Sequence, residues 1–331
     1  MAICLGVFCE GDAKYALAVP RRFWQNLIKV NVRMNAFFPV FPAEARVAFF
    51  GDSITKGGGA LLRVAAQYRA DFPDAGVRFY NVGISGGGVD SANLYFDGWL
   101  APFRPTHVVL GFGVNDSWPL RIDASTQDAA GERERVWKAA ESYRAKYGAL
   151  VERLEAFGAA VAVRTPTPYE AAGPVNDSYG RIAEQIRAVA EERGLPLVDD
   201  FARMSELVSA GEKLFNDDHV HPNDFGHWRM AETLLAAQGL PCAPYRSREE
   251  TAAAAGLAEW DPLSVRLAEV LSTEWLIVRD ETLDVAAKLE KVRGWLARNA
   301  ESPEANPYIV RIARDYLRDK PREAELRAAL Q

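Results

Sequence analysis

Five short runs of β-branched and aromatic residues alternate with longer helical patterns over most of the chain. The runs cover 46–50, 77–80, 107–110, 160–163 and 195–198, and their apolar character predicts buried strands. Helical patterns cover 60–72, 90–100, 132–157, 178–193 and 222–237. Strands that alternate with helices form parallel sheets covered by helices on both faces, so we predict an α/β fold.

The length of 331 residues corresponds to about two average domains, and a single α/β layer with additions would also fit. We predict an N-terminal arm at 1–45 that covers the core, a main domain at 46–240 and a C-terminal helical extension at 241–331. In the extension Val285, Leu289, Val292 and Leu296 follow the spacing of one apolar helix face. We expect the extension to pack on the core, while closure over a site and formation of a homo-oligomer stay open.

Composition excludes several classes of protein. Hydrophobic residues make up 49% and charged residues 25%, which is typical of a globular protein, and the net charge of -6 argues against a nucleic-acid partner. Three cysteines, an odd and small number, favour a reducing compartment over a disulfide framework. The chain has no apolar run long enough for a transmembrane segment and no signal-peptide pattern, so we expect a cytoplasmic protein.

Reactive and flexible residues follow the predicted strands, at the edge where ligands of open parallel sheets bind. GDSIT at 51–55 follows the first strand, NVGISG at 81–86 the second and GFGVND at 111–116 the third, and DDHVHP at 217–222 lies beyond the fifth. Together they bring a serine, a side-chain amide and an acid–histidine pair to one edge. These are the groups that acyl transfer requires.

Each of these residues fits a role in that chemistry. A serine hydroxyl needs a neighbouring base, and the base needs an acceptor that fixes its tautomer; His221 and Asp218 suit those roles for Ser53. The oxyanion of a tetrahedral intermediate needs donors, which the backbone N–H groups of Gly83 and Ser53 and the amide of Asn115 can supply.

The four blocks GDSIT, NVGISG, GVND and DHVHP occur in the order found in the SGNH or GDSL hydrolase superfamily, and the chain resembles that superfamily over residues 46–238. The resemblance implies a flavodoxin-like, three-layer α/β/α sandwich with a five-stranded parallel sheet. It implies Ser53 as nucleophile, His221 with Asp218 as base pair, and Gly83 and Asn115 as oxyanion donors, without a cofactor. Ile54 replaces the leucine of the usual first block.

We therefore expect a serine esterase or deacylase that acts on short acyl or acetyl esters, acetylated carbohydrates among them. An acyltransferase with the same triad and a ligand-binding module without turnover are the alternatives. Ser85 is a rival nucleophile, because 83–87 also read G-x-S-x-G. That interpretation gives no role to 51–55 or 113–115, so we expect Ser85 to be a loop residue. Neither a P-loop nor a dinucleotide fingerprint is complete.

Other polar residues near these blocks have alternative interpretations. His219, His221 and His227, with Asp217 or Asp218, are close enough in sequence for a metal site, but serine-based acyl transfer needs none and we predict no metal. Asp217 is a weaker candidate than Asp218 for the acid partner of His221, because it lacks the three-residue spacing to His221 that the family pattern has.

Asp52 and Asp116 fit a pair of catalytic carboxylates less well than loop supports that accept backbone N–H groups. The segment 164–170 follows the fourth strand at the same edge. We expect it to line the substrate pocket, with Tyr169 and Trp118 as candidate pocket residues.

Overall fold

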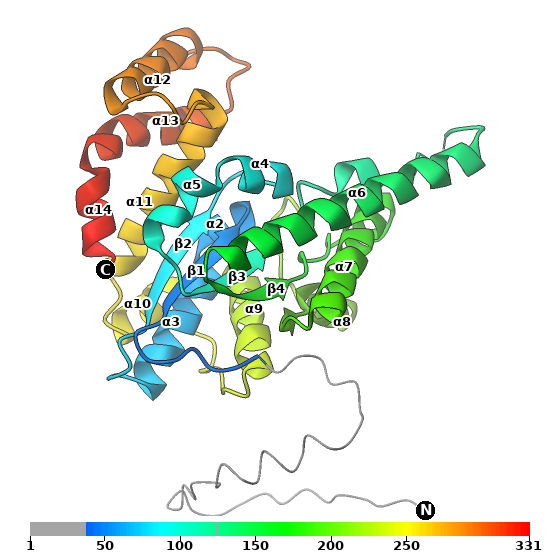
Figure 1. Cartoon of the computed structure of the whole chain (residues 1–331), viewed down its shortest axis with the longest axis horizontal. Coiled ribbons are helices and arrows are strands. Elements are labelled where there is room, and N and C mark those ends of the chain that lie inside the picture. Colours follow the sequence, from blue (N-terminus) through cyan, green and yellow to red (C-terminus); the bar gives the residue numbers. More distant parts are fainter. Residues whose placement is uncertain (1–37, 124) are drawn as a thin grey trace, which may run out of the picture. The chain divides into compact units, whose positions relative to one another are not determined.

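A five-stranded parallel sheet with the order β2-β1-β3-β4-β5 forms the centre of the molecule (Figure 1). The strands are β1 (Arg46–Gly51), β2 (Arg78–Gly83), β3 (His107–Gly111), β4 (Ala160–Arg164) and β5 (Leu197–Val198). All four pairings are parallel, and Gly51 lies opposite both Gly83 and Gly111 in the register. The predicted strands and their parallel arrangement are confirmed.

This computed structural model describes residues 38–123 and 125–331, which belong to one compact unit. Most of the predicted N-terminal arm, residues 1–37, lies outside the described residues. The end of that arm is described: Phe38, Phe41 and Ala45 are buried against one face of the sheet. Within the described residues no helix is long and apolar enough to cross a membrane.

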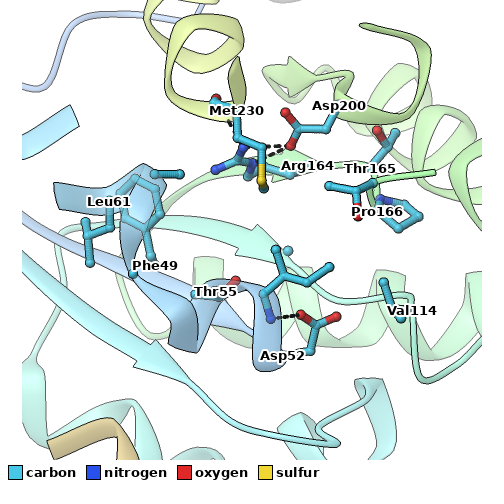
Figure 2. Close-up of a pocket in the computed structure, with 15 residues that line it drawn as sticks. Phe49, Asp52, Thr55, Leu61, Val114, Arg164, Thr165, Pro166, Asp200 and Met230 are labelled. Atoms are coloured by element: carbon cyan, nitrogen blue, oxygen red, sulfur yellow. Dashed lines mark hydrogen bonds and ion pairs between the residues drawn. The ribbon is translucent and has the colours of Figure 1, made fainter. Parts of the chain in front are cut away.

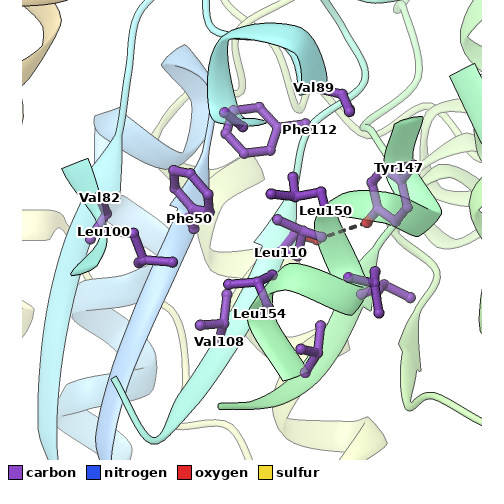
Figure 3. Packing of buried hydrophobic residues seen from close by; sticks show 14 of the residues in the cluster. Phe50, Val82, Val89, Leu100, Val108, Leu110, Phe112, Tyr147, Leu150 and Leu154 are labelled. Atoms are coloured by element: carbon purple, nitrogen blue, oxygen red, sulfur yellow. Dashed lines mark hydrogen bonds between the residues drawn. The ribbon is translucent and has the colours of Figure 1, made fainter. Parts of the chain in front are cut away.

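Helices cover both faces of the sheet, because side chains along each strand alternate between the faces. Phe50, Val82 and Leu110 pack with residues of α4, α5, α6, α7 and α11 in one apolar cluster (Figure 3). On the other face Val47 and Phe49 pack with residues of α3, α8, α9 and α10. The three-layer α/β/α sandwich is therefore confirmed.

The helices of the sandwich are α2 (Ser53–Gly57), α3 (Gly59–Asp71), α4 (Val89–Leu94), α5 (Phe96–Trp99), α6 (Ala129–Ala156), α7 (Pro174–Arg193), α8 (Asp200–Ser209) and α9 (Asp224–Ala237), with 3-10 turns η1 (Ala101–Phe103) and η2 (Trp118–Leu120). The helix predicted at 90–100 is interrupted at Tyr95, whose ψ of 16° leaves the helical range. The sequence analysis missed the short helix α2. Helix α6 begins three residues before the prediction, since the Asp128 side chain caps it by accepting the Gly131 N–H.

The C-terminal region is helical, as predicted, and consists of α10 (Arg248–Ala254), α11 (Trp260–Thr273), the π-helical turn η3 (Glu274–Val278), α12 (Val285–Asn299), α13 (Pro307–Asp319), the 3-10 turn η4 (Lys320–Arg322) and α14 (Glu323–Ala329). Leu267 and Leu271 of α11 belong to the same cluster as the strands, so the region packs on the sandwich. Helices α12 and α13 form a smaller cluster with the end of α11 (Figure 1). Val285 is 49% exposed, so the predicted apolar face of α12 is not buried along its whole length.

Candidate active site

Ser53 is the first residue of α2, immediately after the carboxyl end of β1. Asp52 is the N-cap: its Oδ1 accepts the N–H of Ile54 at 3.0 Å. A Cβ on Gly51 would lie 2.2 Å from Thr55 Oγ1 and 2.4 Å from the Gly111 carbonyl oxygen, so only glycine allows this tight strand-to-helix turn. The turn places Ser53 at a helix N-terminus, where backbone N–H groups have no partner within the helix.

His221 and Asp218 lie in a tight loop between α8 and α9. The Asn216 N–H donates to the His221 carbonyl oxygen at 2.9 Å, and Asp218 Oδ1 accepts the N–H groups of Val220 and His221, both at 2.9 Å. Asp218 Oδ2 lies 2.6 Å from His221 Nδ1, and His221 Nε2 lies 2.9 Å from Ser53 Oγ. The fold thus brings together three side chains that are up to 168 residues apart in sequence.

The electrostatics of this row suit a serine–histidine pair. Partial burial alone would raise the pKa of Asp218, but the N–H groups of His221 and Val220 and the His221 ring outweigh it and lower the pKa. An ionised Asp218 holds a proton on Nδ1 of His221 and leaves Nε2 to accept from Ser53. The side chains of His221 and Asp218 are 44% and 49% exposed, so the row is open to solvent.

Gly83 does not occupy the position predicted for it. Its N–H already donates to Asn81 Oδ1 at 3.0 Å, and the residue is buried at the end of β2. A Cβ there would lie 2.0 Å from the backbone nitrogen of Lys56. Gly83 is therefore a packing residue that lets α2 approach β2, and the prediction that it donates to an oxyanion is wrong.

Gly86, three residues later, is exposed and has a φ of +72° in a turn closed by the Gly87 N–H and the Ile84 carbonyl oxygen. No described residue accepts its N–H. Asn115 is also exposed, and one N–H of its amide donates to the Gly87 carbonyl oxygen at 2.8 Å, which leaves the second for a ligand. The Gly86 amide and the Asn115 side chain thus meet at one turn. The sequence analysis assigned the role of oxyanion donor to Gly83 and missed Gly86, because the two glycines are close in sequence and both fit that role.

Asp52 and Asp116 support loops, as predicted, through backbone N–H groups. Asp116 Oδ1 accepts the N–H of Val89 at 2.9 Å and joins the loop after β3 to the start of α4. Burial raises the pKa of Asp52 to about 7 and that of Asp116 to about 6. Neither carboxyl group forms a hydrogen bond with the side chain of Ser53 or His221, whereas Asp218 bonds to the His221 ring.

The histidines near the site have separate environments. His219 Nδ1 lies 2.7 Å from Glu170 Oε2. This contact joins the loop that carries Asp218 and His221 to the segment after β4. Burial lowers the pKa of His227 in α9 to about 3, and its ring packs against Gly59. Among residues 38–123 and 125–331, no three His, Cys, Asp or Glu side chains gather in a way that could hold a metal ion. Asp218, and not Asp217, contacts His221.

The segment after β4 lies mostly beneath the site. Arg164 is buried and its Nε donates to Asp200 Oδ2 at 2.7 Å; burial raises the pKa of Asp200 to about 6. These two residues line a cavity of about 30 Å³ that also reaches Asp52 and Met230 (Figure 2). This volume fits about two water molecules and no acyl chain. The prediction that all of 164–170 lines a substrate pocket is thus wrong for 164–168, whose side chains are buried.

The two candidate pocket residues differ in exposure. Tyr169 is half-buried and its ring makes edge contacts with His219 and Tyr179 at centroid distances of 6.0 and 6.3 Å. Trp118 in η2 is 70% exposed, with the Arg121 guanidinium 4.4 Å from its ring centroid. An exposed indole three residues after Asn115 offers a flat apolar surface to solvent.

The C-terminal region, which we expected chiefly to pack on the core, also contacts the turn at 85–86 beside the site. Ser85 contacts Tyr308 of α13, with 3.1 Å between the hydroxyl oxygens, and its N–H donates to Ser272 Oγ at 3.0 Å. The Ser85 hydroxyl has no histidine beside it, so the structure offers no support for Ser85 as a nucleophile. No local pattern links position 308 to position 85, since the contact exists only in the folded chain.

The fold and the row of serine, histidine and aspartate at the carboxyl edge of a parallel sheet define a class, the α/β/α-sandwich hydrolases. The chain belongs to the GDSL-like lipase/acylhydrolase family, which it matches over residues 49–229, more than half of its length. It is a carboxylic ester hydrolase of the GDSL type.

Two curated relatives are acetylxylan esterases. The one from Geobacillus stearothermophilus is 26% identical over 215 residues, which are 59% of this chain and 94% of the relative. The one from Xylanibacter ruminicola is 29% identical over 255 residues, which are 70% of this chain and 51% of the relative, so the chain spans about half of that protein.

Solved structures share the fold. A catalytic mutant of the Geobacillus stearothermophilus enzyme has a TM-score of 0.52 at 23% identity and covers 62% of this chain and 99% of its own. A gut microbial diltiazem-metabolizing enzyme has a TM-score of 0.68 at 17% identity and covers 90% of this chain and 96% of its own. The second likeness therefore extends into the C-terminal helices.

Proposed function

We propose that the protein is a serine esterase that removes short acyl groups, acetyl above all, from the hydroxyl groups of a carbohydrate. The observation that carries the mechanism is the unbroken row in which Ser53 Oγ lies 2.9 Å from His221 Nε2 and His221 Nδ1 lies 2.6 Å from Asp218 Oδ2. Catalytic mutants of the Geobacillus stearothermophilus acetylxylan esterase are altered at a serine, an aspartate or a histidine.

In the first half of the reaction His221 Nε2 takes the proton of Ser53 as Oγ attacks the ester carbonyl carbon. The oxyanion accepts hydrogen bonds from the N–H groups of Ser53 and Gly86 and from the Asn115 amide. The intermediate collapses when the carbon–oxygen bond to the alcohol breaks, and His221 returns the proton to the departing alcohol. In the second half the oxygen of water attacks the acyl carbon as His221 Nε2 takes a proton from it; the bond from this carbon to Ser53 Oγ then breaks, and His221 returns the proton to Oγ, which releases the acid and restores Ser53.

The surroundings of the row support a carbohydrate substrate and hydrolysis. An exposed Trp118, three residues after Asn115, offers a surface on which a sugar ring can stack. Acyl transfer to another alcohol depends on keeping water out of the second step. With His221 and Asp218 almost half exposed, hydrolysis is favoured over transfer. A cytoplasmic location and a homo-oligomer through the C-terminal helices stay predictions.

The test uses two variants and a covalent label. Ser53→Ala should lose several orders of magnitude in kcat with 4-nitrophenyl acetate, and Asp218→Asn should also lose most of it, with the circular dichroism spectrum unchanged. A fluorophosphonate should label Ser53 in the folded wild type and leave Ser53→Ala unlabelled. Wild-type activity in Ser53→Ala would refute the mechanism, and acetylation of an added sugar in excess over free acetate would favour transfer.

A further inference from the structure

Lys56 is a buried lysine in the helix that begins at Ser53. It lies in α2 three residues after Ser53, so the two are neighbours on the helix surface. The residue is only 5% exposed, yet no described carboxylate lies within ion-pair distance of its ammonium group. Its ammonium group contacts a neutral group: Nζ donates to the Tyr308 hydroxyl oxygen at 2.6 Å. A buried ammonium group without a counter-charge is costly, and it strongly polarises the groups that solvate it.

The hydrogen bonds from Lys56 have a direction. An ammonium group only donates, so the Tyr308 oxygen accepts from Lys56 and its own hydrogen is available to Ser85 Oγ, 3.1 Å away. Ser85 then has its hydroxyl hydrogen left to donate outward. Ser85 directly precedes Gly86 in the turn that approaches Asn115. The chain of hydroxyl groups therefore ends in a donor beside the proposed oxyanion site.

The C-terminal region holds this turn from three elements. Ser272 at the end of α11 accepts the Ser85 N–H, Trp275 in η3 lies 3.0 Å from the position that a Cβ on Gly86 would take, and Tyr308 begins the first turn of α13. The family match ends at residue 229, so all three elements lie outside it. Tyr308 is 38% exposed, so part of this residue is open to a ligand.

From this arrangement we propose that the C-terminal region builds a subsite for the alcohol portion of the ester, in which the Ser85 hydroxyl group, polarised by Lys56 through Tyr308, donates a hydrogen bond to a carbohydrate oxygen. An acetyl methyl group has no hydrogen-bonding atom, so a polar cluster fits the alcohol and not the acyl group. The subsite makes Tyr308 a specificity-determining residue supplied from outside the family core. This inference rests on the proposed esterase function.

The test compares a sugar ester with an ester that lacks a sugar. Tyr308→Phe removes only the hydroxyl oxygen between Lys56 and Ser85. We expect kcat/KM for mono-acetylated xylobiose to fall about tenfold, mainly through KM, because Ser85 loses the hydrogen bond through which Lys56 polarises and orients its hydroxyl group. With 4-nitrophenyl acetate the fall should be smaller, since that alcohol cannot use the subsite, so the ratio of the two kcat/KM values carries the test.

Tyr316→Phe is the matched control. It removes a hydroxyl group in the same helix α13, one that lies 3.1 Å from Glu274 Oε1 and does not contact the turn at 85–86. It should leave the ratio of the two kcat/KM values unchanged. A second pair of variants covers the case in which Tyr308→Phe does not fold. Ser85→Ala should lower kcat/KM selectively for the sugar ester, and Ser85→Thr, which keeps a hydroxyl group, should retain the wild-type value.

The outcomes separate the two proposals. If the wild type hydrolyses 4-nitrophenyl acetate through Ser53 but Tyr308→Phe and Ser85→Ala change both substrates equally or neither, the subsite is refuted and the esterase function stands. A wild type that hydrolyses 4-nitrophenyl acetate but not the sugar ester also refutes the subsite. If Ser53→Ala keeps the activity, the esterase mechanism itself fails.

Discussion

Replacing Asp52 by asparagine tests whether this buried carboxyl group binds a proton in the folded protein and so makes stability depend on pH. Asp52 is 2% exposed, and burial is the largest cause of the rise of its pKa from 3.8 to about 7, with the Asp116 charge adding to it. Asparagine keeps an oxygen that can accept the Ile54 N–H at the start of α2, while it removes the charge.

The sign of the pH dependence follows from the direction of the shift. Since the pKa of Asp52 is higher in the folded than in the unfolded protein, the folded state binds more protons between pH 3.8 and about 7. The contribution of Asp52 to stability is therefore greatest at low pH and falls as the pH rises through this window. Between pH 5 and pH 8 the wild type should lose roughly 2 kcal/mol that Asp52→Asn does not lose.

Urea unfolding, followed by tryptophan fluorescence at pH 5 and pH 8, measures this difference directly. The gap in the free energy of unfolding between variant and wild type should shift in favour of the variant by roughly 2 kcal/mol from pH 5 to pH 8. Asp116 and Asp200, whose pKa values burial also raises, are present in both proteins and largely cancel. A gap that is the same at both pH values would show that Asp52 is not a buried, proton-binding support.

Two further predictions concern the turn at 83–86 and the exposed tryptophan. Gly83→Ala should destabilise the fold by about 3 kcal/mol in urea unfolding, because its Cβ would lie 2.0 Å from the Lys56 nitrogen. Gly86→Ala, at φ +72°, should cost about 1 kcal/mol of stability but lower kcat more than Gly83→Ala does. A larger loss of kcat in Gly83→Ala than in Gly86→Ala would restore Gly83 as the oxyanion donor. Trp118→Ala should leave thermal stability almost unchanged, as the side chain is 70% exposed, and raise KM for acetylated xylobiose only; an equal rise with 4-nitrophenyl acetate would contradict its stacking on sugar.

The parts of the site that the sequence analysis located correctly have local causes. Ser53 and Asn115 each follow a strand whose apolar run is recognisable, and parallel strands end at a common edge. Asp218 and His221 are three residues apart, so one tight loop is sufficient to join them. Gly83 was assigned wrongly because a glycine that donates an N–H and a glycine that admits a neighbouring helix are alike in sequence.

The sequence by itself determined the strands, most of the helices, the parallel sheet and the groups that reach its carboxyl edge, because periodicity and turn chemistry act over a few residues. Only the tertiary structure decided which surfaces meet over long separations. It buried Arg164 against Asp200 beneath the site, and it placed Tyr308 on Lys56 and Ser85, 252 and 223 residues away. Such contacts depend on how whole helices pack on the sandwich, which no short pattern encodes.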